Sequence, residues 1–417
     1  MTKRINLKRA NVARSNTIRD INRQIVLNYI REEGPISRAE IARLTALQRS
    51  TVSLIVEELL NTGLIEEVYG ESSGGRPPQL LSLRAANAVA LGIDLGKKRT
   101  IVASSDLAGR VLDKAEFATD RDLTVTMDRI IDCARMMIQK SGGSIEGVGL
   151  SVPGLVEPIK GTVLHIPHLD WDRPDITGRL STLTGLPVRA ENDANAAALA
   201  ELWFGRPEIS EVRDFITVLI DNGIGTGIVF DGQIYHGKDG VAGEFGHMTI
   251  GHDAPIACSA GRFDCWESFA SERSAIARYS KASGKKNGES VTFPELVELA
   301  LEGQDHAIRA LKETAEYIGI GVSSLIQGLS PEVIVIAGSI VRAWSVIEED
   351  VKKAAIRSIC QGYPSANVMP STLGAFPTLM GALSLVLANK FASISIHLDF
   401  PPLRLQNPIS SALFRCS

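Results

Sequence analysis

The sequence lacks the features of exported and membrane-embedded proteins. Its cysteines are too few and too scattered for a disulfide framework, and they are Cys133, Cys258, Cys265, Cys360 and Cys416. No apolar run approaches the roughly 18 residues that a membrane-spanning helix needs. The basic N-terminus is not followed by the apolar stretch of an export signal. We therefore expect a cytoplasmic protein with no membrane partner.

The chain has little net charge, but its charge is unevenly distributed. It has 417 residues, 44% of them hydrophobic, and a formal net charge of -4, which indicates a globular chain of two or three domains. Residues 1–85 hold thirteen Lys and Arg against nine Asp and Glu, so this segment carries +4 and the remainder -8. A basic segment on an otherwise acidic chain is typical of nucleic-acid binding, which we predict for the first domain.

Three predicted helices lie in the basic segment. Apolar residues at helical spacing from Ile21 to Ile30 stop at Gly34-Pro35. Ser37 with Glu40 three residues later predicts a capping box at the start of a second helix, and residues 49–60 predict a third. This arrangement is typical of a helix-turn-helix, although a generic three-helix bundle gives the same pattern.

A strand pair is predicted after the third helix. Residues 64–68 and 80–83 are strand-like and flank a polar tip at 70–78, as in a wing. The third helix opens with an arginine and small hydroxylic residues, which suit phosphates and base edges in a major groove, and the tip carries an arginine beside two prolines. The candidate DNA-binding residues are Arg49, Ser50, Thr51, Ser53 and Arg76.

A second candidate site lies between positions 243 and 267, where acidic and metal-binding side chains gather. These are Glu244, His247, Cys258, Cys265 and Glu267. Imidazole and thiolate are the usual ligands of Zn²⁺, and the glycines beside Glu244 and His247 would let the backbone approach a bound group. A metal bound there would also fix both carboxylates around one polar site, whereas a solvated loop with incidental cysteines is the alternative.

This segment resembles the zinc and sugar segment of the ROK family of repressors, open reading frames and sugar kinases. The resemblance lies in Gly-Glu-Phe-Gly-His at 243–247, followed by Cys258 and by Cys265-Trp266-Glu267. The basic segment is also similar to the winged domain that ROK repressors carry and ROK sugar kinases lack, in its Ser-Arg-Ala-Glu-Ile-Ala, Arg-Ser-Thr-Val-Ser and Gly-Gly-Arg-Pro-Pro stretches.

The resemblance implies a zinc site that departs from the family pattern. Ala260 stands where the family has its second cysteine, and Asp264 where it has a glycine. Three protein ligands then remain, namely His247, Cys258 and Cys265. A closed site would need His252, Asp264 or a water in the fourth position.

The implied fold is an N-terminal winged helix-turn-helix followed by a two-lobed α/β actin-like domain of the sugar-kinase type. We expect domains at 1–85 and 86–390, and residues 391–417 form a tail without a motif that we can interpret. The effector-binding residues that the resemblance implies are Asn192, Asp193, Glu244, His247 and Glu267. Among them, Asp193 matches the position of the kinases' catalytic base.

The nucleotide side differs from the kinase pattern. After Asp94-Leu95-Gly96, Lys97-Lys98-Arg99 replaces a Gly-Thr pair, and Ala337-Gly338-Ser339 offers a single glycine. His168 also stands where asparagine is usual. With the sugar-side residues present, these departures predict a degenerate domain without significant kinase activity, and neither ATP nor Mg²⁺ as cofactor.

The predicted function is a sugar-responsive transcriptional regulator, a repressor. Its partners would be operator DNA, a sugar or sugar phosphate, and further copies of the chain in a dimer or tetramer. One alternative is an ATP-dependent sugar kinase with an added DNA-binding domain, favoured by Asp94, Asp193 and Gly223–Gly227. Another is a scaffold that binds a protein instead of a sugar.

Overall fold

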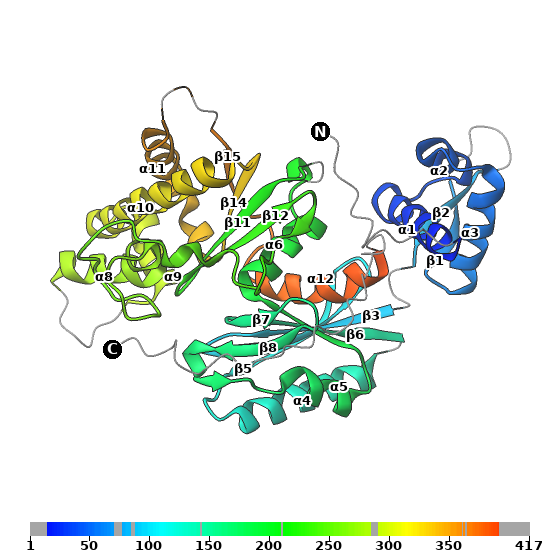
Figure 1. The fold of residues 1–417 in the computed structure, drawn as a ribbon, viewed down its shortest axis with the longest axis horizontal. Coiled ribbons are helices and arrows are strands. Elements are labelled where there is room, and N and C mark those ends of the chain that lie inside the picture. The colour runs from blue at the N-terminus through cyan, green and yellow to red at the C-terminus, as the bar shows by residue number, and fades with distance from the viewer. Residues whose placement is uncertain are drawn as a thin grey trace, which may run out of the picture. The chain divides into compact units, whose positions relative to one another are not determined.

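The structure, a computed structural model, describes residues 15–70, 77–84, 88–141, 144–209, 212–284, 291–360, 362 and 365–391 (Figure 1). The chain divides into two compact units: residues up to Thr62 with Glu67–Ser82 belong to the first, and Gly63–Glu66 with Leu83–Asn389 to the second. Within the described ranges, no helix is both long and apolar enough to cross a bilayer.

The first unit contains nearly all of a winged helix-turn-helix, apart from strand residues Ile65, Glu66 and Leu83, which belong to the second unit. The elements of the winged helix-turn-helix are α1 (Ser15–Glu33), α2 (Arg38–Thr45), α3 (Arg49–Asn61), β1 (Ile65–Tyr69) and β2 (Gln79–Leu83). These bounds confirm the predicted third helix and the two predicted strands to within about one residue at each end. Of the polar tip at 70–78, residues 71–76, with the predicted DNA-binding residue Arg76, lie outside the described residues.

The start of α2 differs in part from the predicted capping box. The Oγ of Ser37 accepts a hydrogen bond from the backbone N–H of Glu40 over 3.1 Å, as expected. The carboxylate of Glu40, however, accepts from the guanidinium of Arg43 one turn later. The predicted reciprocal bond was wrong because an arginine three residues on offers a charged donor.

The core of the first unit joins the helices to the wing. Val52, Ile55, Val56 and Leu59 form the buried stripe of α3. Ile36 and Leu81 exchange backbone hydrogen bonds of 3.0 and 2.7 Å, and both side chains are buried. The opposite side of α3 is left exposed.

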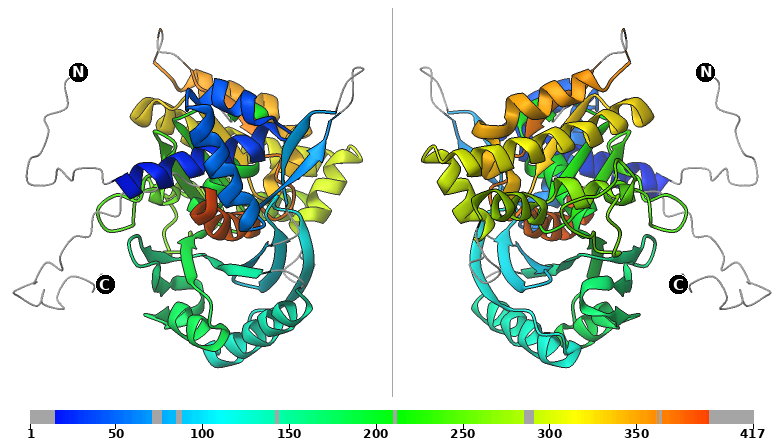
Figure 2. Two further views of the ribbon diagram at one scale, coloured as in Figure 1. Left: turned by 90° about the vertical axis from the view of Figure 1, so that its right-hand side faces the viewer. Right: turned by 90° about the vertical axis from the view of Figure 1, so that its left-hand side faces the viewer.

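The first lobe of the second unit is built on a five-stranded sheet in the order β10-β6-β3-β4-β5. Its strands are β3 (Ala88–Leu95), β4 (Arg99–Asp106), β5 (Val111–Ala118), β6 (Ser144–Val152) and β10 (Val188–Asn192). Helices α4 (Leu123–Lys140) and α5 (Ile176–Thr184) lie on one face of this sheet, and α12 (Pro377–Phe391) lies on the other (Figure 1 and Figure 2). A smaller sheet joins β7 (Leu155–Glu157), β8 (Thr162–Ile166) and β9 (Trp171–Asp172).

The second lobe has a sheet in the order β13-β12-β11-β14-β15. Its strands are β11 (Phe215–Ile220), β12 (Ile224–Phe230), β13 (Gln233–Ile234), β14 (Val333–Ala337) and β15 (Asn367–Pro370). The helices of this lobe are α6 (Asp193–Phe204), α7 (Trp266–Ala270), α8 (Glu272–Ser283), α9 (Phe293–Leu301), α10 (Asp305–Leu329) and α11 (Trp344–Arg357). Because α6 packs on one face of β11 and α10 on the other, β11 is buried throughout, which explains why its residues are apolar apart from Thr217.

Short 3₁₀ segments complete the second unit, and one of them carries the candidate site. They are η2 (Pro167–Leu169), η3 (Pro207–Ile209), η4 (Glu244–His247) and η5 (Ser339–Ala343). The next site helix, α7, is anchored to α10, since the indole N–H of the buried Trp266 donates to the carbonyl of Tyr317 over 2.9 Å.

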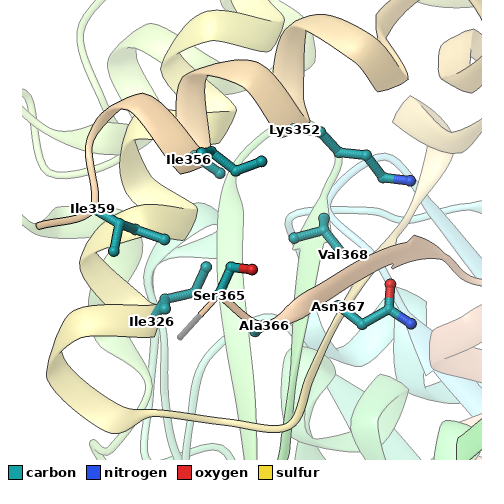
Figure 3. A pocket seen from close by; sticks show the side chains of 9 residues that line it. Ile326, Lys352, Ile356, Ile359, Ser365, Ala366, Asn367 and Val368 are labelled. Atoms are coloured by element: carbon teal, nitrogen blue, oxygen red, sulfur yellow. The ribbon is translucent and has the colours of Figure 1, made fainter. Parts of the chain in front are cut away.

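A groove of about 360 Å³ lies between the ends of α10 and α11 and the edge strand β15 (Figure 3). It is largely apolar. Its lining residues are Ile326, Lys352, Ala355, Ile356, Ile359, Ser365, Ala366, Asn367 and Val368. None of these belongs to the sites predicted from the sequence.

Candidate functional site

The η4 segment is held tightly against β12 by its glycines. Gly243 has φ of +97°, and a Cβ there would lie 2.2 Å from the carbonyl oxygen of Thr226. A Cβ on Gly246 would lie 2.1 Å from the carbonyl oxygen of Ile224. These glycines were expected to admit a bound group, but the backbone that they accommodate is that of β12.

His247, Cys258 and Cys265 converge as the sequence predicted. One ligand atom from each lies within 4.8 Å of those of the other two, and both thiols are buried. His247 is the last residue of η4, Cys258 begins a turn that its carbonyl closes with Gly261, and Cys265 is the N-cap of α7. Three separate segments therefore bring the ligands together, and a β-bridge between Cys265 and Thr249 links two of them. Nδ1 of His247 is buried without a hydrogen-bond partner in the described structure. An imidazole nitrogen in that state, beside two thiols, fits a Zn²⁺ site.

Asp264 lies beside this cluster but is engaged elsewhere. Its Oδ1 is 3.7 Å from Sγ of Cys265. Both carboxylate oxygens accept hydrogen bonds of 2.9 Å from Arg262, and one also accepts from Thr249. Within the described residues, neither Asp264 nor His252 joins the converging group, and Ala260 is exposed on the turn.

Glu267 is a buried carboxylate with its own set of partners. Its Oε1 accepts from the backbone N–H of Ser259 over 2.6 Å and from Nη2 of Arg273 over 3.0 Å. The second oxygen lies 3.3 Å from the hydroxyl of Ser259. Arg273 also donates to the carbonyl of Asn222 over 2.7 Å. Ser259 and Arg273 were missed by the sequence analysis, because no motif marks them, and they fix the orientation of Glu267.

Asn192 and Asp193 lie where the first lobe leads into α6. Oδ1 of Asn192 caps the helix by accepting from the N–H groups of Ala194 and Asn195, and its Nδ2 donates to Gly154 over 3.1 Å. Burial raises the pKa of Asp193 to about 7, and the carboxylates of Asp94, Asp221 and Glu244 act in the same direction. Asp193 is half-buried and keeps some solvent access.

The carboxylates that raise the pKa of Asp193 include two at the ends of strands, one in each lobe. Burial raises the pKa of Asp94, at the end of β3, to about 6. It also raises the pKa of Asp221, after β11, whose Oδ1 accepts from the N–H of Ser339 over 2.8 Å. Glu272, at the start of α8, has its pKa raised to about 8 by burial, opposed by Lys98 and Arg99.

The cations after β3 therefore face acidic groups of the protein itself. Arg99 lowers the pKa of both Asp94 and Asp221, and its guanidinium also lies 3.2 Å from Glu116. Lys97 acts on a different group, because it and Arg273 both lower the pKa of His168, after the larger effect of burial. The sequence marked Lys97 only as a departure from the kinases' phosphate loop, and its proximity to His168 was not foreseen.

One ion pair near the site was not anticipated from the sequence. Nε2 of His236 lies 2.7 Å from Oε2 of Glu191, and Oε1 of Glu191 accepts from Asn195 over 3.1 Å. Burial lowers the pKa of His236, but the hydrogen bond and charge of Glu191 raise it above its ordinary value. The carbonyl of His236 accepts from Ala242, so the pair secures the loop that precedes Glu244.

In the winged helix-turn-helix, Arg49 differs from the other arginines that the structure describes. Those that the structure describes between 19 and 84 pair with carboxylates, in Arg19–Glu58, Arg23–Glu58, Arg31–Glu32, Arg38–Glu67, Arg43–Glu40 and Arg84–Glu66. Arg49 has no such partner among the described residues and stands exposed at the first position of α3. Ser50 is exposed and Thr51 half-buried, while the hydroxyl of Ser53 donates to the carbonyl of Arg49.

Known proteins match both units of the chain. A profile described as winged helix-turn-helix DNA-binding matches residues 19–66. The chain is 34% identical over 334 residues to a xylose repressor of Caldicellulosiruptor bescii, covering 76% of this chain and 83% of the relative. It also resembles the crystal structure of a ROK family transcriptional regulator, a homologue of the Escherichia coli MLC protein, with a TM-score of 0.75 and 25% identity over 90% of this chain and 98% of that one.

The second unit also resembles sugar kinases. The crystal structure of a ROK family glucokinase from Streptomyces griseus, in complex with glucose and AMPPNP, is similar with a TM-score of 0.65 and 27% identity, covering 71% of this chain and 98% of that chain. These similarities confirm the predicted fold class. The profile of the ROK family itself matches residues 90–389. The chain therefore belongs to the ROK family.

Proposed function

We propose that this chain is a transcriptional repressor that binds operator DNA through its winged helix and responds to a sugar or sugar phosphate bound in its ROK domain. The observation that carries the proposal is the combination of two features in one chain. Arg49 is exposed and lacks a carboxylate partner among the described residues, at the start of α3. A group of carboxylates and an imidazole lies around η4 in the second unit.

The proposed effector-binding residues are Asn192, Asp193, Glu244, His247 and Glu267. The carboxylate of Glu244 is largely exposed, so its oxygens can accept hydrogen bonds from sugar hydroxyls. Nε2 of His247 lies 3.9 Å from this carboxylate. Glu267 is oriented by Arg273, as a binding carboxylate should be. The cations beside His168, Lys97 and Arg273, would favour a phosphate on the sugar.

Zn²⁺ fits the residues that converge beside the effector group. His247, Cys258 and Cys265 would hold it, and the unpartnered Nδ1 of His247 supports this assignment. Bound there, the ion would brace the turns that carry Glu244 and Glu267. Since Ala260 supplies no ligand, a water or the effector would complete the four ligands that zinc prefers.

We propose further that the chain is not an active kinase. Gly338, the single glycine of its turn, is required by packing, because a Cβ there would lie 2.4 Å from the carbonyl oxygen of Ile220. Lys97 to Arg99 place long cationic side chains on the turn whose backbone would have to come close to the phosphates of a nucleotide. Asp193 and the similarity to a glucokinase favour the alternative, a sugar kinase that uses ATP and Mg²⁺.

The remaining proposals concern assembly and location. A repressor of this kind would act as a dimer or tetramer, because two recognition helices must be spaced to match two half-sites. We propose that it is cytoplasmic, with a DNA-binding domain at 1–85, an effector domain at 86–390 and a tail at 391–417.

The test combines two assays on the full chain. Thermal melting against a panel of sugars and sugar phosphates should identify a ligand that raises the melting temperature, since a ligand bound to the native state stabilises it by RT ln(1 + [L]/Kd). The same ligand should change the affinity for a duplex selected by the chain from a random library. A ligand that raises the melting temperature without changing DNA affinity would contradict the proposal.

A further inference from the structure

Leu54 is a large apolar side chain on the side of α3 that the protein core does not use. Its side chain is 68% exposed. The core stripe of α3 is already formed by other residues, namely Val52, Ile55, Val56 and Leu59. Burial within the first unit therefore does not explain a leucine at this position.

The neighbours of Leu54 place it on the outward face. Residues spaced three or four apart lie on one stripe of a helix. On the stripe of Leu54 the other exposed residues are Ser50, four positions earlier, and Glu57 and Asn61, three and seven positions later. Ser53 also faces outward, but its hydroxyl is bonded back to the carbonyl of Arg49. Leu54 is thus the apolar side chain that projects from this face, one turn beyond Ser50.

The proposed function places this face of α3 in the major groove of DNA. A leucine side chain has no hydrogen-bonding group, so it cannot read the donors and acceptors of the base edges. The C5-methyl of thymine is the apolar group that the major groove presents. We infer that Leu54 packs against a thymine methyl and makes operator recognition depend on thymine at that position, an inference that rests on the proposed DNA-binding function.

The contact has a definite energetic signature. Both groups leave water when the helix enters the groove, and each gains apolar contact only while the other is present. Removing either group should therefore cost about the same, and removing both should cost little more than removing one. A methyl-sized contact corresponds to an affinity change of about four-fold.

The test replaces thymines by deoxyuridine, one at a time, in a duplex that the full chain selects from a random library. This change removes the methyl and leaves base pairing and the other groove atoms in place. At one position per half-site, the wild type should bind about four-fold more weakly. The Leu54→Ala variant should show no further loss at that position, whereas Leu54→Met, which stays apolar, should keep the sensitivity.

Control variants separate the alternatives. Leu301→Ala removes a leucine that is 58% exposed on α9 and should keep the full sensitivity to deoxyuridine. The inference is overturned if deoxyuridine lowers the DNA affinity of the wild type and of Leu54→Ala equally at every thymine. It is also overturned if deoxyuridine lowers the affinity of the wild type at no thymine. A Leu54→Ala variant whose oligomeric state changes while its sensitivity persists would assign Leu54 to a protein contact, which also overturns it. If the wild type selects no duplex, the proposed function itself fails. If Arg49→Ala binds as tightly as the wild type, α3 lies outside the interface and the inference about Leu54 is overturned.

Discussion

His236 and Glu191 form a 2.7 Å ion pair that ties the loop before Glu244 to the strand that leads into Asn192 and Asp193. The ion pair therefore links two segments of the proposed effector site, the loop before Glu244 and the end of β10. Since both side chains are mostly buried, the pair is screened little by solvent.

The pair predicts a pH-dependent contribution to stability. Because Glu191 raises the pKa of His236, the stabilisation is fully present below the ordinary histidine pKa of about 6.5 and is lost as the pH rises through the raised value. We expect His236→Ala to lower the free energy of unfolding by about 1–2 kcal/mol at pH 6 and by less at pH 8. Melting of both proteins across this range measures the difference, and Glu191→Gln should remove its pH dependence. A difference that grows with pH would contradict the assignment.

Zinc binding is expected at one ion per chain. Elemental analysis of the purified protein should find it, and chelation should lower the melting temperature because the ion braces the turns around Cys258 and Cys265. Cys258→Ser should lose the metal, while Cys360→Ser, at an exposed cysteine away from the cluster, should retain it. Well under one zinc per wild-type chain, with Cys258→Ser nearly silent, would show that Ala260 has removed the site.

Sugar-dependent ATP hydrolysis should be absent with every sugar tested. The expectation follows from Lys97 to Arg99 and from the single glycine at 338, which do not provide a close backbone cradle for phosphates. A coupled assay for ADP is the measurement. A turnover of roughly 1–100 s⁻¹ that Asp193→Asn abolishes would establish the kinase alternative instead.

Operator binding should depend on Arg49. Replacing it by alanine should weaken binding to the selected duplex by about 1–3 kcal/mol if its guanidinium contacts a base. Arg43→Ala is the matched control, since that arginine already pairs with Glu40 and should matter little. Binding of both proteins should also weaken as salt increases. Unchanged affinity in Arg49→Ala, with the helical circular dichroism intact, would remove α3 from the interface.

Much of the fold could be predicted because its signals are local. The helical stripe of α3, the cap at Ser37 and the strands of the wing each follow from residues close in the chain. The convergence of His247 with Cys258 and Cys265 was also predictable, because the three lie within one segment of recognisable spacing.

The partners that orient the site could not be predicted. His236 and Glu191 are 45 residues apart and carry no shared pattern, and Arg273 reaches Glu267 only because α7 and α8 meet at a sharp turn. The packing role of the glycines beside Glu244 and His247 was not foreseen for a similar reason, since the carbonyls of Thr226 and Ile224 approach them from another strand. Such contacts are set by tertiary packing, which one sequence does not display.

We propose that a sugar bound near η4 controls operator affinity. A ligand can shift DNA binding only by binding two arrangements of the protein unequally, and we propose that Glu244, whose carboxylate is largely exposed, binds that ligand. The decisive measurement is the affinity of wild type and Glu244→Ala for the selected duplex, with and without the ligand found by melting. We expect the ligand to change the affinity of the wild type and not of Glu244→Ala, with both binding equally in its absence. If the ligand changes the DNA affinity of Glu244→Ala as much as that of the wild type, control of operator binding through a sugar at Glu244 is contradicted.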